Sequence, residues 1–139
     1  MGLDTTHDCW HGAYSAFSRW RNHLAEAAGY TLVTERTDFF THEQPNIDWA
    51  AIVDSNYAGE WDATPADPLV VLIAHSDCDG VIHPAQAEPL ADRLEELLPK
   101  LDEAESAGHI ARLGMRGTTE RFITGLREAV KADEDVDFQ

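Results

Sequence analysis

The chain has 139 residues, 43% of them hydrophobic, so it has the size of one domain and enough apolar side chains to form a core. Its 26 acidic and 10 basic residues give a formal net charge of −16, which disfavours direct nucleic-acid binding because phosphate contacts require basic patches. The longest apolar run, Leu69 to Ala74, is far shorter than the roughly 18 residues of a membrane span, and no signal-peptide pattern opens the chain. We therefore expect one cytoplasmic domain over residues 1–139 that binds neither membrane nor nucleic acid.

The first predicted element is an amphipathic helix over residues 10–28, followed by Gly29 as a typical C-terminal cap. Its apolar positions recur at steps of three and four residues: Trp10, Ala13, Tyr14, Phe17, Trp20, Leu24 and Ala28. The start of this helix is ambiguous. Thr5 and Asp8 have the spacing of a capping box, whereas Asp8 as the cap would place Cys9 in the first turn.

The middle of the chain predicts little regular structure. Residues 30–36 alternate like a short strand, and residues 37–67 are rich in turn-forming residues, with a short helix over 47–53 at most. The aromatic side chains of this segment indicate packing against the core: Phe39, Phe40, Trp49, Tyr57 and Trp61. Residues 68–75 fit a buried strand or a helix capped by Asp67, and we favour the helix.

Two further helices are predicted in the second half of the chain. The first spans 87–101, where Pro89 opens the helix and Pro99 disturbs it. The second is capped by Thr118 and precedes an acidic tail over about 132–139. The expected fold class is mainly α, with α+β as the alternative. We expect a compact domain of three to four helices, a long aromatic-containing loop region and at most a short β element.

Residues 75–86, HSDCDGVIHPAQ, match the centre of an EF-hand calcium loop. With Gly80 at the sixth position, the third and fifth positions supply carboxylates and the seventh supplies a main-chain carbonyl. The ligands would be His75, Asp77, Asp79 and Val81. The ends do not match, because a histidine stands at the first position and Gln86, at the twelfth, cannot supply the bidentate carboxylate. The expected calcium affinity is low.

Two other interpretations of this loop remain open. In one, both aspartates accept main-chain N–H bonds in a turn and Gly80 has a positive φ. In the other, the loop binds zinc together with softer, weaker candidate ligands: His7, Cys9, His11 and Cys78. A helix beginning at Thr6 would place His7 and His11 on one face, whereas an extended segment would bring His7 and Cys9 to one side. The expected cofactor is zinc or calcium, or none.

Cys9 also suggests an enzyme as an alternative function. A helix N-terminus lowers the pKa of a thiol, as in papain-type proteases, and a distant histidine then acts as the base. Such a small Cys/His hydrolase would use Cys9 as the nucleophile and His75 as the base, oriented by Asp77 or Asp79. No oxyanion-hole glutamine or glycine motif precedes Cys9, so a buried structural thiol is the competing interpretation.

Four blocks of the sequence resemble a family of small proteins carried by phages, prophages and bacteria: GLDTTHDCWHGAYSAFSRWR at 2–21, HSDCDGVI at 75–82, ADRLEELLP at 91–99 and FITGLREAVKADEDVDFQ at 122–139. No activity is established for that family, so the resemblance implies a phage-linked role and no catalytic residue. Together with the acidic charge, it leads us to expect a non-enzymatic accessory protein that binds a host or phage component, for example to inhibit or evade a bacterial defence system. The expected partner is a protein, either basic or DNA-binding. A small-molecule or metal-sequestering protein is a third hypothesis.

Overall fold

The computed structural model describes residues 2–29, 32–36, 43–47, 67–73, 75, 80–106 and 115–139, with the backbone alone for 32–36, 43–47 and 103–106. Helices dominate these residues: α1 (Tyr14–Ala27), α3 (Leu69–Ile73), α4 (Pro84–Ser106), α5 (Met115–Ala132) and the 3-10 turn η1 (Thr6–Asp8). The strands are short and form antiparallel pairs: β1 (Gly2–Asp4) with β2 (His11–Ala13), β3 (Leu32–Arg36) with β4 (Glu43–Ile47), and β5 (Val81–Ile82) with β6 (Val136–Asp137). The mainly α fold predicted from the sequence is confirmed.

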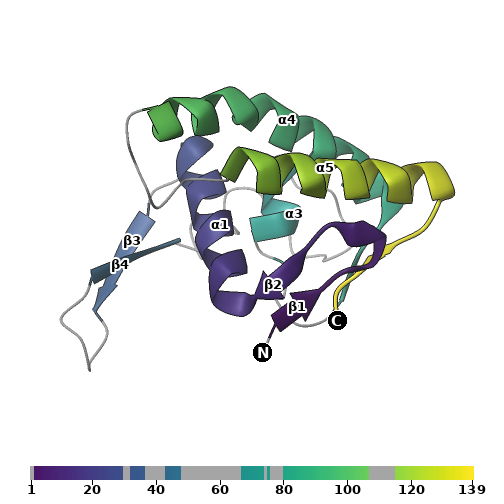
Figure 1. Ribbon diagram of the computed structural model, residues 1–139, viewed down its shortest axis with the longest axis horizontal. Helices are drawn as coiled ribbons and strands as arrows, with labels where there is room; N and C mark the ends of the chain where they lie inside the picture. The colour runs from purple at the N-terminus through teal and green to yellow at the C-terminus, as the bar shows by residue number, and fades with distance from the viewer. Residues whose placement is uncertain are drawn as a thin grey trace.

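The long helices pack in two layers (Figure 1). α4 and α5 run side by side along one side of the molecule, and α1 crosses beneath them, with α3 packed against both α1 and α4. The β1–β2 hairpin leads into α1, and η1, which joins its two strands, lies against α5. None of the described helices is long and apolar enough to cross a membrane.

An aromatic cluster forms the centre of the core. Trp20 of α1 stacks on Trp10 with 5.3 Å between ring centroids and packs against Phe122 of α5 at 4.9 Å. Phe17 presents its ring to Trp10 edge-on at 5.1 Å. The Trp20 indole N–H donates to Thr119 Oγ1 at 2.9 Å, which satisfies a polar group that burial would otherwise leave without a partner. These contacts fix α1 against α5.

The predicted start of the first helix was wrong. α1 begins at Tyr14 rather than at Trp10, although its end before Gly29, which has a φ of 92°, is confirmed. Residues 11–13 form β2 instead, and Trp10 reaches the aromatic cluster from the loop before it. Thr5 does not cap a helix, because its hydroxyl oxygen accepts the Trp10 N–H at 2.9 Å. Pairing with β1 thus overrides the helical spacing of these residues.

The helix favoured for residues 68–75 is confirmed as α3. Its cap is also as predicted, because Asp67 Oδ1 accepts the Leu69 N–H at 3.0 Å. The start predicted for the following helix was wrong, because α4 begins at Pro84 rather than at Pro89 and continues through Pro99. A proline in the first turn lacks only an N–H that has no intrahelical partner there, so Pro84 is compatible with this start.

The last helix also begins earlier than predicted. α5 starts at Met115 and contains Thr118, so Thr118 is not its cap. Thr119, one residue later, donates its hydroxyl to the Met115 carbonyl oxygen at 2.7 Å. Its oxygen is the atom that accepts the Trp20 indole N–H, so this turn of α5 is fixed by the core rather than by a capping residue.

The segment expected to be an acidic tail is part of the fold. α5 ends in a Schellman motif, in which the Glu134 N–H donates to the Ala129 carbonyl at 2.9 Å and the Asp133 N–H donates to the Val130 carbonyl at 3.1 Å. Asp133 occupies the left-handed position of this motif with a φ of 55°. The chain then reverses and forms β6, where Val136 is fully buried.

The middle of the chain confirms one strand and contains another that was not predicted. β3 lies within the strand predicted over 30–36, and it pairs with β4. β4 was missed because Pro45 and Asn46 favour turns and edge positions. The short helix predicted over 47–53 lies almost entirely outside the described residues, as does the rest of the aromatic-containing segment 37–67.

Gly125→Ala is expected to destabilise the protein by about 2 kcal/mol, because the added methyl group would overpack the contact between α5 and η1. A Cβ at Gly125 would meet Cys9 Sγ and would lie 2.7 Å from the His7 carbonyl oxygen. Gly117→Ala is the matched control, because a Cβ at Gly117 of the same helix meets nothing within 4 Å. Urea denaturation should show no loss for this control, and equal losses in both variants would contradict the close approach.

Candidate functional site

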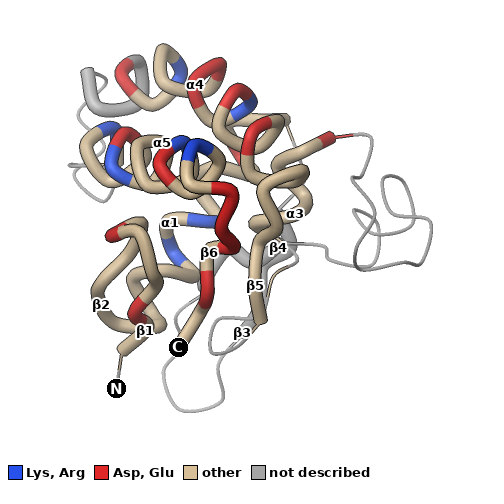
Figure 2. The backbone as a smooth tube through the Cα atoms, turned by 90° about the vertical axis from the view of Figure 1, so that its right-hand side faces the viewer, with Lys and Arg blue, Asp and Glu red and all other residues tan. Residues whose placement is uncertain are grey.

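Three distant parts of the sequence meet around Phe138. Its main chain pairs with Thr5 as an antiparallel bridge, and its N–H donates to the Gly80 carbonyl oxygen at 2.9 Å. Its ring is buried and lies 4.0 Å from the His75 ring between centroids. The β1–β2 hairpin, His75 with residues 80–82, and the C-terminal segment therefore contribute to one surface, which lies to the front in Figure 2.

This surface carries a run of exposed carboxylates, which we call the C-terminal acidic face: Asp133, Glu134, Asp135 and Asp137. Figure 2 shows it as a red segment between the β1–β2 hairpin and β5. Its backbone is ordered, because the Asp137 N–H donates to Thr6 Oγ1 at 2.9 Å and β6 pairs with β5. In the alternating pattern of β6, Val136 points inward and Asp137 outward.

Histidines are the only described basic partners of this face. His83 Nδ1 lies 3.0 Å from Asp135 Oδ1, and His7 Nε2 lies 3.8 Å from Glu134 Oε1. In the described part of the chain, no lysine or arginine lies within ion-pair distance of any of its four carboxylates. The negative charge of the C-terminal acidic face therefore has no permanently charged partner among the described residues.

A second histidine–carboxylate group lies beside the face, at His11. Its Nδ1 lies 2.7 Å from Asp4 Oδ1 and its Nε2 lies 2.6 Å from Asp8 Oδ1. The bonds to Asp4 and then to Asp8 raise the pKa of His11 above its ordinary value. The Arg121 guanidinium also binds Asp8 Oδ1, at 2.7 Å, and together with His11 it lowers the pKa of that carboxyl.

The described residues of the EF-hand-like loop use their polar groups within the protein. His75 Nε2 lies 3.0 Å from the Val81 carbonyl oxygen, so the groups at the first and seventh positions bind each other. The Gln86 side chain accepts the His83 N–H at 3.1 Å, as in a capping box at the start of α4. Gly80 has a φ of 90°, which confirms the positive φ expected of a turn. The two aspartates, Asp77 and Asp79, lie outside the described residues, so their role stays a prediction.

Cys9 has the surroundings of a structural thiol. It is 1% exposed, its Sγ packs against Gly125 of α5, and burial raises its pKa to about 12. Cys9 also does not lie at the N-terminus of a helix, because it follows η1 and α1 begins only at Tyr14. The helix N-terminus that would have lowered the pKa of a nucleophilic thiol is therefore missing at this position.

The softer candidate zinc ligands are not brought together. Residues 7–9 adopt neither of the two geometries considered for them, because His7 and Asp8 have left-handed φ values of 57° and 58°. Cys9 points into the core while the His11 ring is bound by two carboxylates at the surface. Among the described residues no group of three histidine, cysteine or carboxylate side chains is arranged to hold a metal ion; Cys78 is not among them.

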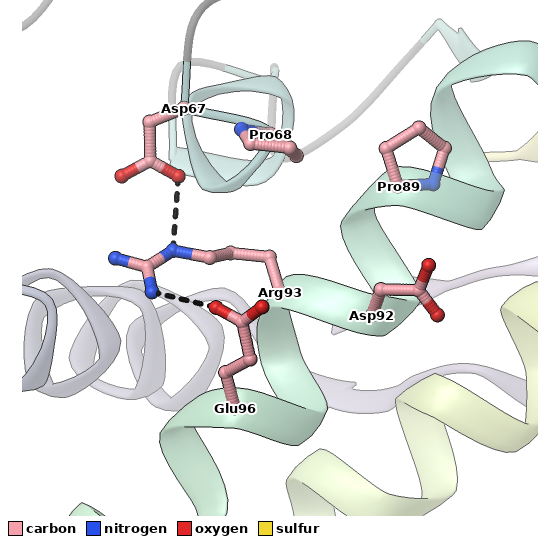
Figure 3. A pocket seen from close by; sticks show the side chains of 6 residues that line it. All are labelled: Asp67, Pro68, Pro89, Asp92, Arg93 and Glu96. Carbon is pink, nitrogen blue, oxygen red and sulfur yellow. Dashed lines mark hydrogen bonds and ion pairs between the residues drawn. The ribbon is translucent and has the colours of Figure 1, made fainter.

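A separate hollow of about 440 Å³ lies between α3 and α4 (Figure 3). Its arginine, Arg93, binds Asp67 Oδ1 through Nε and Glu96 Oε2 through a terminal nitrogen, both at 3.1 Å. In Figure 3 the Asp92 carboxylate points away from Arg93, and it binds Arg127 of α5 instead. This arrangement ties α3 to α4 through Asp67, which also caps α3.

One of these groups left a signal in the sequence that was missed. Asp8 and His11 are three residues apart, a spacing that brings side chains together in a tight turn as well as in a helix. The other pairs join residues at opposite ends of the chain, such as His7 with Glu134, and the sequence offers no local pattern for them.

Cys9 is expected to react with iodoacetamide only after unfolding. With a pKa of about 12, only ~10⁻⁵ of the thiol is ionised at pH 7, and burial also blocks access. The measurement compares alkylation rates of native and urea-unfolded protein in a Cys78→Ala background. Rapid alkylation of the native protein would restore Cys9 as a candidate nucleophile.

We expect the protein to hold no stoichiometric calcium or zinc at the EF-hand-like loop, because His75 and Val81 bind each other and Gln86 caps α4. Elemental analysis with native mass spectrometry, before and after chelator, measures this directly. A stoichiometric metal that disappears in the Asp77→Ala, Asp79→Ala double variant would contradict the expectation and identify the loop as the site.

The surface around Phe138 combines the described parts of three of the four sequence blocks singled out in the sequence analysis: residues 2–21, 75–82 and 122–139. Residues 2–11 carry Asp4, Asp8 and His11, residues 80–82 carry the Gly80 turn, and residues 133–139 carry the C-terminal acidic face. Comparisons with protein-family models, with curated proteins and with solved structures gave no match. The function of this surface is therefore inferred from the chemistry of its own residues.

Proposed function

We propose that this is a non-enzymatic binding protein that engages a positively charged protein through its C-terminal acidic face. One observation carries the proposal: four exposed carboxylates are fixed on ordered backbone, with histidines as their only basic partners among the described residues. A fixed array of charges attracts an oppositely charged partner and orients it at lower entropic cost than a disordered acidic tail would.

The distribution of basic side chains supports this proposal. Arg116 and Arg127 each bind two carboxylates of the helices, and Arg121 binds Asp8. Two further cations bind main-chain carbonyl oxygens: Lys100 donates to Ala27 at 3.0 Å, and Arg21 donates to Leu72, Ile73 and His75 at the end of α3. These basic residues are thus engaged away from the C-terminal acidic face, whose described basic partners are histidines.

The surroundings of Cys9 favour binding over the alternative of a Cys/His hydrolase. A nucleophilic thiol needs a lowered pKa and access to substrate, whereas Cys9 has a raised pKa and is packed against α5. His75 uses its Nε2 in a bond to the Val81 carbonyl within its own loop.

The biological role that we propose follows from the sequence resemblance together with this chemistry. A phage-type accessory protein acts in the cytoplasm of the bacterial host, where basic and DNA-binding proteins are abundant targets for an acidic surface. Inhibition or evasion of a defence system by occupying the basic surface of one of its components is the specific form of the proposal.

Neutralising the C-terminal acidic face should weaken binding of a synthetic lysine- and arginine-rich peptide by at least about tenfold at low ionic strength. The variant combines conservative changes to amides: Asp133→Asn, Glu134→Gln, Asp135→Asn and Asp137→Asn. Isothermal titration calorimetry at two salt concentrations measures the affinity, and the native interaction should weaken as salt rises.

The matched control removes four charges from the outward face of α4: Glu88→Gln, Asp92→Asn, Glu95→Gln and Glu96→Gln. It has the same net charge as the first variant, so we expect less than about a threefold loss if the position of the charges matters. Equal losses in the two variants would show that net charge alone attracts the peptide, and the assignment of the partner surface to the C-terminal acidic face would be wrong.

A further inference from the structure

The His11 ring lies between two carboxylates in a way that specifies its protonation state. Nδ1 is 2.7 Å from Asp4 Oδ1 and Nε2 is 2.6 Å from Asp8 Oδ1. A neutral imidazole has one N–H donor and one acceptor nitrogen, and an ionised carboxylate only accepts. Both bonds can form together only when the ring is an imidazolium with an N–H on each nitrogen.

The two bonds of His11 join different parts of the structure. Asp4 and His11 are direct partners in the register of the β1–β2 hairpin, so the bond through Nδ1 stays within that hairpin. Asp8 belongs to η1, and Arg121 binds it to α5 through the carbonyl oxygen at 3.1 Å and through Oδ1 at 2.7 Å. Besides the main chain itself, the Nε2 bond is the side-chain hydrogen bond of His11 that ties the hairpin to the part of η1 held on α5.

The backbone of η1 is held in a conformation of raised energy. His7 and Asp8 are consecutive non-glycine residues with left-handed φ values, an arrangement that persists only where other contacts hold it. The contacts on one side are the Arg121 bonds to Asp8 and the packing of Cys9 against Gly125. On the other side is the His11 bond to Asp8.

We propose that His11 is a proton-dependent latch between the β1–β2 hairpin and η1. In the protonated ring both nitrogens donate, and the hairpin is joined to the segment that Arg121 holds on α5. When the ring releases its Nε2 proton to solvent, Nδ1–H keeps its bond to Asp4. The Nε2 lone pair then faces the Asp8 carboxylate, and this contact opens.

The charged groups that face His11 determine the pH at which the latch opens. Asp4 from β1 and Asp8 from η1 favour the imidazolium and raise its pKa above 6.5, while Arg121 from α5 shares the Asp8 oxygen. The unfolded chain has the ordinary histidine pKa of 6.5, so below pH 6.5 the protonated His11 contributes its full stabilisation of the folded protein. This stabilisation is lost as the pH rises through the raised pKa of the folded protein, where His11 gives up its extra proton. The latch is independent of the proposed binding partner.

Nuclear magnetic resonance of the full chain tests the latch directly. We expect both His11 ring nitrogens to carry protons at pH 6, with a midpoint above the ordinary histidine value. The amide resonances of residues 6–8 should move with the same midpoint as the ring. Amides of η1 that stay constant while His11 titrates would overturn the proposal.

Two substitutions separate the two bonds of His11, which is exposed enough to tolerate them, with 46% of its side-chain surface accessible. His11→Asn keeps a donor near the Nδ1 position and cannot reach Asp8. The amide resonances of η1 should therefore stay, at every pH, where they lie at high pH in the native protein. His11→Gln places a donor near the Nε2 position, so these amides should stay at their low-pH positions. His83→Gln is the control, because it removes another histidine–carboxylate pair and should leave the transition unchanged. A transition that persists with its native midpoint in both His11 variants would also overturn the proposal.

Discussion

The burial of Phe138 is the interaction on which the candidate site depends. Its ring lies 6.0 Å from Phe17 and 4.0 Å from His75, between centroids, so it connects the aromatic core to the residue that opens the EF-hand-like loop. Full burial of such a side chain contributes about 1.5–3 kcal/mol, a considerable share of the marginal stability of a small domain. The backbone around it meets both Thr5 and Gly80, and the residues beside it are consequently fixed at the surface.

The charge distribution has a different origin in the two halves of the structure. Between α4 and α5, arginines pair with carboxylates. Arg127 of α5, for example, binds both Asp92 and Glu95 of α4. Around Phe138 the described partners of the carboxylates are histidines, together with Arg121 at Asp8. In the described part of the chain, arginine–carboxylate pairs thus join the helices, and most histidine–carboxylate pairs lie where β1, η1 and β6 meet.

Local patterns explain most of the helices but not the surface that they support. The apolar spacing of α1 and α5 and the Asp67 cap of α3 are short-range features, and they were enough to predict these helices to within a few residues. The apolar spacing wrongly predicted a helix over residues 10–13. Trp10 has the sequence spacing of a residue on the buried helix face, but it packs on Trp20 from a loop. The acidic segment 133–137 has the composition of a disordered tail, and it becomes a strand through its pairing with β5 and the bond of the Asp137 N–H to Thr6. Such contacts between distant residues have no local pattern that could reveal them.

The pairing of Thr5 with Phe138 also affects the order in which the protein folds. The two residues are separated by almost the whole chain, and contacts of such long range form late because closing the intervening loop costs entropy. During synthesis the helices α1 and α4 leave the ribosome before residues 136–138 exist to complete the junction. The C-terminal acidic face is therefore assembled last, and a nascent or truncated chain with well-formed helices would still lack the surface through which we propose the protein acts.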